Sequence, residues 1–407
     1  MKKLSVVAMI LVLIMVFTGC SSNELKLYDS FQKTQEVTSM ESDMAFSFTI
    51  GGEGFSEKEQ ADLQNVANML NSTKMNIHQK MVRNKENTAA RALADTKVNL
   101  GGISMDMGVW VDVDMSGENP KLVEIIKMPP FVMASMPAGY NNKEYIIYDF
   151  QKIMDGNQEN ININKLLKFS KEMQPKFTKL IKDSKTEFNP GFEIVKCNNK
   201  KVIDGKELTI YEVKLDDAAF KKLLRYTANY YMDNKDIAEF VKEYIKLVME
   251  MTKPKTEEEK LAQDEIKKEL ENAEKELPSI KEEFNTFMDA YKDVKILGDK
   301  GIAIEYGVDS DGYIVHEAGS VDLRIDLGAL GKSKEKGILK FSIEYNTKVY
   351  NINSDMKVDL PVIDENNSFN IMDMINGTMN QQKLEPTGSI GAPIEVPASV
   401  EPIKPTK

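Results

Sequence analysis

One stretch of the chain alternates between two kinds of side chain for long enough to dictate its local structure. In ISMDMGVWVDVDM, residues 103–115, every odd position is apolar, and the even positions are mostly polar or acidic. Successive side chains of a strand point to opposite faces of its sheet. The stretch therefore predicts a long strand with one continuous apolar face, three of whose seven members are methionine.

Other stretches with the same alternation lie on both sides of it. They are residues 44–50, 74–82, 120–128, 143–150, 202–213, 300–327 and 338–352. Asp204-Gly205 suits a two-residue type I′ hairpin turn, and residues 309–312 suit a second turn. Because no βαβ unit repeats, the pattern predicts an antiparallel sheet.

Helical periodicity separates two groups of these strands. A helix is expected near residues 24–40, a short helix or long loop at 56–70, and a helix at 164–183. Residues 216–291 change to a helical period with a heptad seam, which we interpret as a helical insertion that the sheet could fold without. This apolar seam would pack against a neighbouring helix of the same chain or, as an alternative, form a dimeric coiled coil. Pro278 should kink or split the helix that carries the seam.

The N-terminus has the composition of a secretory signal. Lys2 and Lys3 precede a fourteen-residue apolar run, residues 4–17, which is shorter than the roughly 20 residues of a comfortable membrane span. The run ends in FTGC, which resembles the lipobox of bacterial lipoproteins. That resemblance implies that residues 1–19 are a signal peptide and that Cys20 carries a lipid anchor with acyl chains such as palmitate.

The anchor would place the mature protein on the extracytoplasmic face of a cell membrane. Frequent Lys, Asn, Ile and Glu suggest an AT-rich genome and a Gram-positive host. The formal net charge is −11, and loss of Lys2 and Lys3 would make it −13. An acidic chain without a long basic cluster argues against nucleic acid as a partner.

No set of residues for catalysis is evident in the sequence. His78 and His316 each lack a spaced metal-ligand partner, Cys197 has no adjacent His, and common nucleophile and phosphate-loop motifs are absent. We therefore expect no metal, no cofactor and no enzymatic activity. Residues 385–407 hold five prolines without periodicity, which predicts a disordered tail.

These features together resemble the LolA/LppX-like group of envelope lipoproteins, in an uncharacterised clostridial-type branch. The resemblance rests on the opening helix before SMESDMAFSFTI, the one-sided strands, and the DSDGYIVHEAGSVDLRIDL hairpin followed by KFSIEYNTKVYNIN. It implies an α+β domain over residues 20–384. Its strongly curved antiparallel sheet would form an open half-barrel with helices against the concave face.

Carriers of that group hold acyl chains between sheet and helices, which implies a lipid or other apolar ligand here. The stripe and the first strand would then line a ligand cavity through Phe46, Phe48, Ile103, Met105, Met107, Val109, Val111 and Val113. Methionine suits such a surface because it adapts to irregular shapes. The alternative is an interaction or scaffold module with the same fold and a filled core, which binds protein or cell wall.

The lipid anchor is testable by one substitution. Cys20→Ala should release the protein from membranes or leave the signal uncleaved, because it removes the thiol that would be acylated. Detergent-phase partitioning and the size of the mature chain measure this outcome. Unchanged partitioning of the variant would show that Cys20 is not the anchor.

Overall fold

The computed structural model describes residues 22–117, 120–151, 172–173, 175–177, 179–180, 188–251, 254, 256–329 and 336–375. The signal peptide, Cys20 and the tail at 385–407 lie outside these residues, as does most of the helix expected at 164–183. No helix in the described part of the chain combines the length and the apolar composition that a membrane crossing needs.

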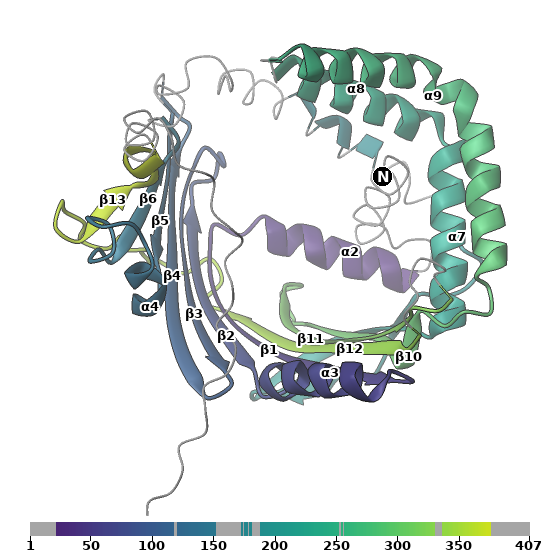
Figure 1. Ribbon diagram of the computed structural model, residues 1–407, viewed down its shortest axis with the longest axis horizontal. Coiled ribbons are helices and arrows are strands. Elements are labelled where there is room, and N and C mark those ends of the chain that lie inside the picture. Colours follow the sequence, from purple (N-terminus) through teal and green to yellow (C-terminus); the bar gives the residue numbers. More distant parts are fainter. Residues whose placement is uncertain are drawn as a thin grey trace, which may run out of the picture.

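The fold is α+β, with a single long sheet that runs through most of the described residues. The strands are β1 (Ser39–Glu53), β2 (Lys74–Arg83), β3 (Ala89–Leu100), β4 (Ile103–Asp114), β5 (Lys121–Lys127), β6 (Tyr145–Asp149), β7 (Val195–Cys197), β8 (Lys201–Ile203), β9 (Lys206–Leu215), β10 (Leu297–Val308), β11 (Ile314–Asp326), β12 (Ile338–Tyr350) and β13 (Ser368–Asn370). Their order is β13-β6-β5-β4-β3-β2-β1-β12-β11-β10-β9-β7, and β8 pairs with β9. The sheet is strongly curved and open, as expected, with β13 and β7 at its two ends (Figure 1).

Pairing is antiparallel at every junction in this order except β13 with β6. The turn at Asp204-Gly205 has positive φ at both residues, 49° and 78°, which a type I′ hairpin requires. Strand β3 was not expected from the sequence. It joins β4 through Gly101 and Gly102, which also take positive φ, 58° and 89°.

One helix precedes β1, and the others lie between strands along the chain. The helices are α2 (Ser22–Gln35), α3 (Glu57–Leu70), α4 (Pro130–Ala134), α7 (Asp217–Asp233), α8 (Lys235–Met251) and α9 (Glu257–Ala290). The stretch expected to be a short helix or a loop is therefore helical. A capping box between Ser56 and Glu59 begins α3 and satisfies two backbone amides. In Figure 1, α2 lies on the concave side of the sheet, and α7, α8 and α9 arch over the space beyond it.

The main core lies where α2 and α7 meet β9 and β10. Leu27 of α2 is 2% exposed, Val195 of β7 is 0% exposed, and both belong to one apolar cluster with Tyr211 of β9. Phe31 of α2 packs edge-on against Tyr306 of β10, with ring centroids 5.1 Å apart. This cluster fixes α2 against the sheet.

Helix α7 belongs to that core, so the expectation that residues 216–291 as a whole are dispensable needs correction. Leu223 of α7 is 8% exposed and sits in the same cluster as Leu27, and Ala228 is fully buried. Helical periodicity in the sequence shows that a helix has an apolar face, but it does not show which element covers that face. The dispensable part, if any, starts after α7.

Polar side chains join helix α9 to α7. Asn229 and Asn285 exchange amide hydrogen bonds of 3.1 and 2.8 Å, and Arg225 pairs with Asp289. The seam residues Ile280 and Phe287 remain 37% and 51% exposed. Helix α9 continues through Pro278 without being split and follows a bent path (Figure 1).

A pair of leucine substitutions tests where the core ends. Leu223→Ala should lower the free energy of unfolding by about 3 kcal/mol, because it leaves a cavity in the cluster beneath α2. Leu261→Ala on α9, where the side chain is 66% exposed, should change it by less than about 0.5 kcal/mol. Urea denaturation followed by circular dichroism measures both. Equal effects would mean that α7 is no more part of the core than α9.

Candidate functional site

The register of the sheet places the apolar stripe on the same face as α2. Directly paired residues of neighbouring strands share a face. One unbroken row of such pairs crosses eight strands through Met107, Thr96, Ile77, Met44, Thr347, Glu317, Tyr306 and Tyr211. Since Tyr306 packs against Phe31 of α2, Met107 lies on the face that α2 covers. We call this concave face the inner face (Figure 1).

A second row, two residues along each strand, is almost wholly apolar. It runs through Met105, Val98, Met75, Phe46, Tyr345, Gly319, Ile304 and Val213. Aromatic rings stack across the β1–β12 junction, with centroids 6.1 Å apart for Phe46 and Tyr345 and 6.4 Å apart for Phe48 and Phe341. The eight residues expected to line a cavity therefore share the inner face.

Exposure differs along this face, which is sealed near α2 and partly accessible across β1 to β4. Near α2, Tyr211 and Val213 are 6% and 9% exposed. Across β1 and β4, by contrast, Phe46, Phe48, Met105, Met107, Val109, Val111 and Val113 are only half-buried. Ile103 lies at the end of β4 and is 64% exposed. A filled core would cover such side chains almost completely, so this half of the inner face is accessible in the described structure.

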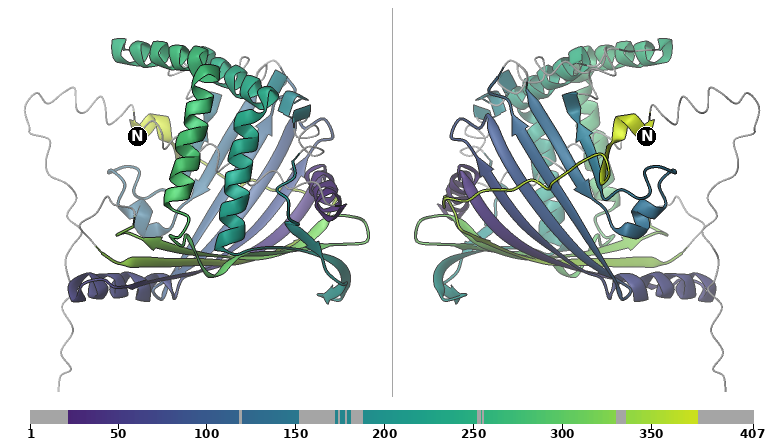
Figure 2. Two further views of the ribbon diagram at one scale, coloured as in Figure 1. Left: turned by 90° about the vertical axis from the view of Figure 1, so that its right-hand side faces the viewer. Right: turned by 90° about the vertical axis from the view of Figure 1, so that its left-hand side faces the viewer.

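The opposite, outer face is buried around the middle of β4 and β5. Residues 351–367, between β12 and β13, cross this outer face (Figure 2). On it Ile125 is 3% exposed and Asp112 is 5% exposed. Among the even-numbered residues of the alternating stretch, Asp112 is therefore buried, whereas Asp106 and Asp114 are exposed.

Burial of Asp112 is compensated by two cations. Its carboxylate accepts hydrogen bonds from Arg91 Nε at 3.0 Å and from Lys121 Nζ at 2.6 Å. Desolvation by burial raises the pKa of Asp112, but these two hydrogen bonds and the charges behind them outweigh it and hold the pKa below its usual range. The aspartate thus joins β3, β4 and β5 on the outer face.

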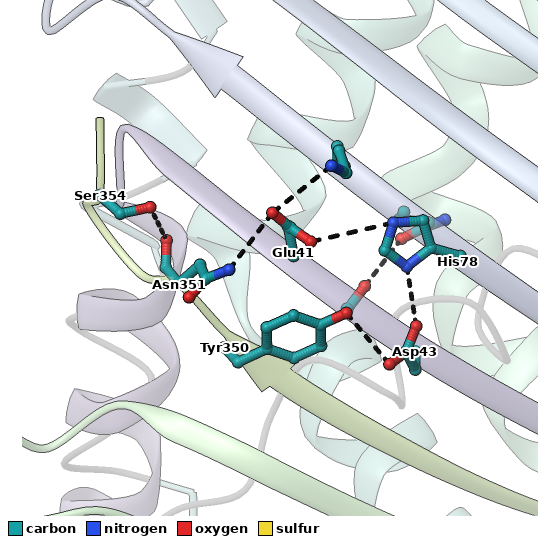
Figure 3. Close-up of polar contacts among 9 residues, drawn as sticks. Glu41, Asp43, His78, Tyr350, Asn351 and Ser354 are labelled. Atoms are coloured by element: carbon teal, nitrogen blue, oxygen red, sulfur yellow. Dashed lines mark hydrogen bonds and ion pairs between the residues drawn. The ribbon is translucent and has the colours of Figure 1, made fainter. Parts of the chain in front are cut away.

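A polar network covers the outer face of β1, β2 and β12 (Figure 3). His78 Nδ1 lies 2.8 Å from Asp43 Oδ1, and the Tyr350 hydroxyl donates to Asp43 Oδ2 at 3.1 Å. Glu41 accepts from Asn351 at 3.3 Å, and its other oxygen lies 3.9 Å from His78 Nε2. Within the described residues, no group of three or more His, Cys, Asp or Glu side chains is arranged to hold a metal ion.

Two residues that sequence reasoning missed lie near the centre of the inner face. The Tyr345 hydroxyl donates a hydrogen bond of 2.6 Å to Glu317 Oε1. Desolvation raises the pKa of the Glu317 carboxyl, against the smaller opposing effect of this hydrogen bond. The alternation of residues 317–321 could have flagged Glu317, because it stands in the inward phase with Gly319 and Val321.

Comparison with known proteins yields no family model and no curated relative that matches the chain. Among solved structures, the lipoprotein LppX of Mycobacterium tuberculosis aligns with 82% of this chain and 97% of its own. The sequence identity is 10% and the TM-score is 0.24. This likeness concerns the general fold and carries no argument for function. Nothing in it supports a clostridial-type branch.

The buried aspartate of the outer face gives a prediction for stability and its pH dependence. Asp112→Asn should lower the free energy of unfolding at pH 7 by about 2 kcal/mol, since it leaves Arg91 and Lys121 without their shared carboxylate. Asp114→Asn, an exposed change on the same strand, is the control and should cost less than about 0.5 kcal/mol.

The pKa of Asp112 is lowered on folding, so its stabilisation is present above the unfolded-state pKa of about 4 and is lost as pH falls through the folded-state value. Urea titrations at several pH values should show the gap between wild type and Asp112→Asn at full size near pH 7. The gap should shrink in acid. A gap that is constant down to the acid transition would contradict the role given to Asp112.

Proposed function

We propose that the protein is a lipid-anchored, extracytoplasmic lipoprotein that holds an apolar ligand, a lipid, against the inner face of its sheet. The observation that carries the proposal is the accessible apolar stripe on β4, which continues across β3, β2 and β1 toward α2. Soluble proteins rarely leave a large contiguous apolar surface open unless it binds something. Methionines on this stripe suit ligands of variable shape.

The size of the hydrophobic effect indicates how such a ligand would be held. Each buried methylene contributes about 0.8 kcal/mol, so a chain with about ten buried methylenes contributes about 8 kcal/mol. Association costs at least about 4 kcal/mol, which leaves one such chain only weakly bound. We therefore expect a ligand with two or more chains, held against the inner face.

The proposed role is non-catalytic, because the sequence assembles no nucleophile, metal site or acid-base set. The anchor at Cys20 would keep the binding domain at the outer surface of the cell membrane, close to a supply of lipid. The rival role, a scaffold that binds protein or cell wall, requires the inner face to be filled and unable to take up ligand.

One charge placed on the inner face separates the two roles. Met107→Lys should keep a cooperative thermal melt, because a partly exposed lysine can extend its charged end into water, but it should abolish uptake of a two-chain fluorescent lipid. Asp106→Lys, next to it on the outer face, is the matched control and should affect neither. Fluorescence titration and calorimetry provide the two readouts.

The results of this pair are unambiguous. Loss of uptake with an intact melt in Met107→Lys, and normal uptake in Asp106→Lys, supports the ligand role. If wild-type protein takes up no lipid and Met107→Lys unfolds, the inner face is a sealed core and the scaffold role replaces the one proposed here.

A further inference from the structure

The Glu317–Tyr345 pair is a polar pair set into an apolar surface. Glu317 comes from β11 and Tyr345 from β12, and both lie on the inner face by register. Phe46 stacks on the Tyr345 ring from the β1 side, and Tyr306 pairs with Glu317 from the β10 side. The carboxylate thus lies at the border between the part of the inner face that α2 covers and the accessible part.

The pair depends on a glycine. A Cβ atom at Gly319 would lie 2.5 Å from Tyr345 Cε1 and 2.7 Å from the Tyr345 hydroxyl oxygen. No real Cβ tolerates such contacts, so the ring can lie across β11 and reach Glu317 only because position 319 has no side chain. Three residues on two strands are therefore needed to hold the carboxylate and the hydroxyl 2.6 Å apart.

The hydrogen bonding of this carboxylate is incomplete. Within the described part of the chain, Tyr345 is the one hydrogen-bond donor to Glu317, and it reaches only Oε1. A carboxylate can accept about four hydrogen bonds, and a carboxylate on an apolar surface with fewer hydrogen bonds than this loses free energy of solvation. A ligand group that donates a hydrogen bond to Glu317 would relieve this cost, whereas an anionic group would be repelled by it.

We propose that Glu317, held by Tyr345, selects uncharged lipids that carry a hydrogen-bond donor, such as the free hydroxyl of a diacylglycerol, over anionic lipids with the same chains. This selection rests on the proposed function, because it assigns the polar contact within the same ligand site. The acyl chains would lie along the methionine and valine rows of β2, β3 and β4.

The test compares two lipids with identical chains, dioleoylglycerol and dioleoylphosphatidic acid. Full-length protein is equilibrated with vesicles containing equal amounts of each, and native mass spectrometry quantifies the lipid that stays bound. Wild-type protein should retain dioleoylglycerol at least about tenfold over phosphatidic acid. Glu317→Leu should lose about tenfold in dioleoylglycerol retention, which corresponds to one hydrogen bond to a charged group.

Two further variants make the result specific. Glu317→Gln keeps the shape and a hydrogen-bonding amide without the charge, so it should retain dioleoylglycerol within about threefold and accept phosphatidic acid. Glu344→Gln, on the outer face of β12 with an exposed Lys300 partner, should behave as wild type. Should Glu317→Leu fail to fold in thermal melts, the gain of phosphatidic acid binding in Glu317→Gln decides the question.

The outcomes distinguish this inference from the function on which it rests. If wild-type protein retains both lipids equally, or if Glu317→Gln leaves the preference unchanged, Glu317 does not select the ligand although the inner face still binds lipid. If wild-type protein retains neither lipid, both the inference and the proposed function are wrong.

Discussion

The structure depends on one long sheet whose inner face is largely apolar, and which α2 and α7 seal at one end while leaving the part across β1 to β4 only half-buried. At β9 and β10 the helices α2 and α7 bury this face, and that cluster supplies the fixed core. Across β1 to β4 the same rows continue with half-buried side chains. Apolar surface left in water costs about 25 cal/mol per Å², so an open face of this kind is favoured only if something else covers it in use.

The two faces of the sheet therefore have different roles. The outer face carries the interactions that specify the fold, including the Asp112 pair with Arg91 and Lys121, the crossing segment 351–367, and the network around His78. Since these contacts hold the strands from outside, the inner face can stay partly uncovered without loss of register. A ligand on the inner face would then add to stability rather than create the fold.

Alternation in the sequence was enough to predict most strands, the hairpin turns and the antiparallel class. It failed for β3, whose inward positions begin with Ala90, Ala92 and Ala94 and so give a weak apolar signal. Periodicity also assigns a side chain to a face without saying whether that face is covered. For this reason the burial of Asp112 on the outer face and the place of α7 in the core could not be predicted.

The sequence predicted the apolar stripe of one strand in the candidate site, but not the surface that this strand forms with its neighbours. Residues 103–113 gave one strand of it, whereas the rows that join this strand to α2 depend on the pairing of strands far apart in sequence. The Glu317–Tyr345 pair depends further on Gly319, whose importance appears only when the Tyr345 ring is seen to cross it. Local patterns contain no information about such cross-strand contacts.

The central claim is that the inner face is accessible until a lipid covers it, and methionine oxidation tests this most directly. Met44, Met75, Met105 and Met107 are half-buried on the inner face, whereas Met133 and Met288 are 2% and 5% exposed. In delipidated protein treated with peroxide, the first four should oxidise readily, and added two-chain lipid should protect them; Met133 and Met288 should resist in both states. Resistance of all six without lipid would show a filled core and contradict the account.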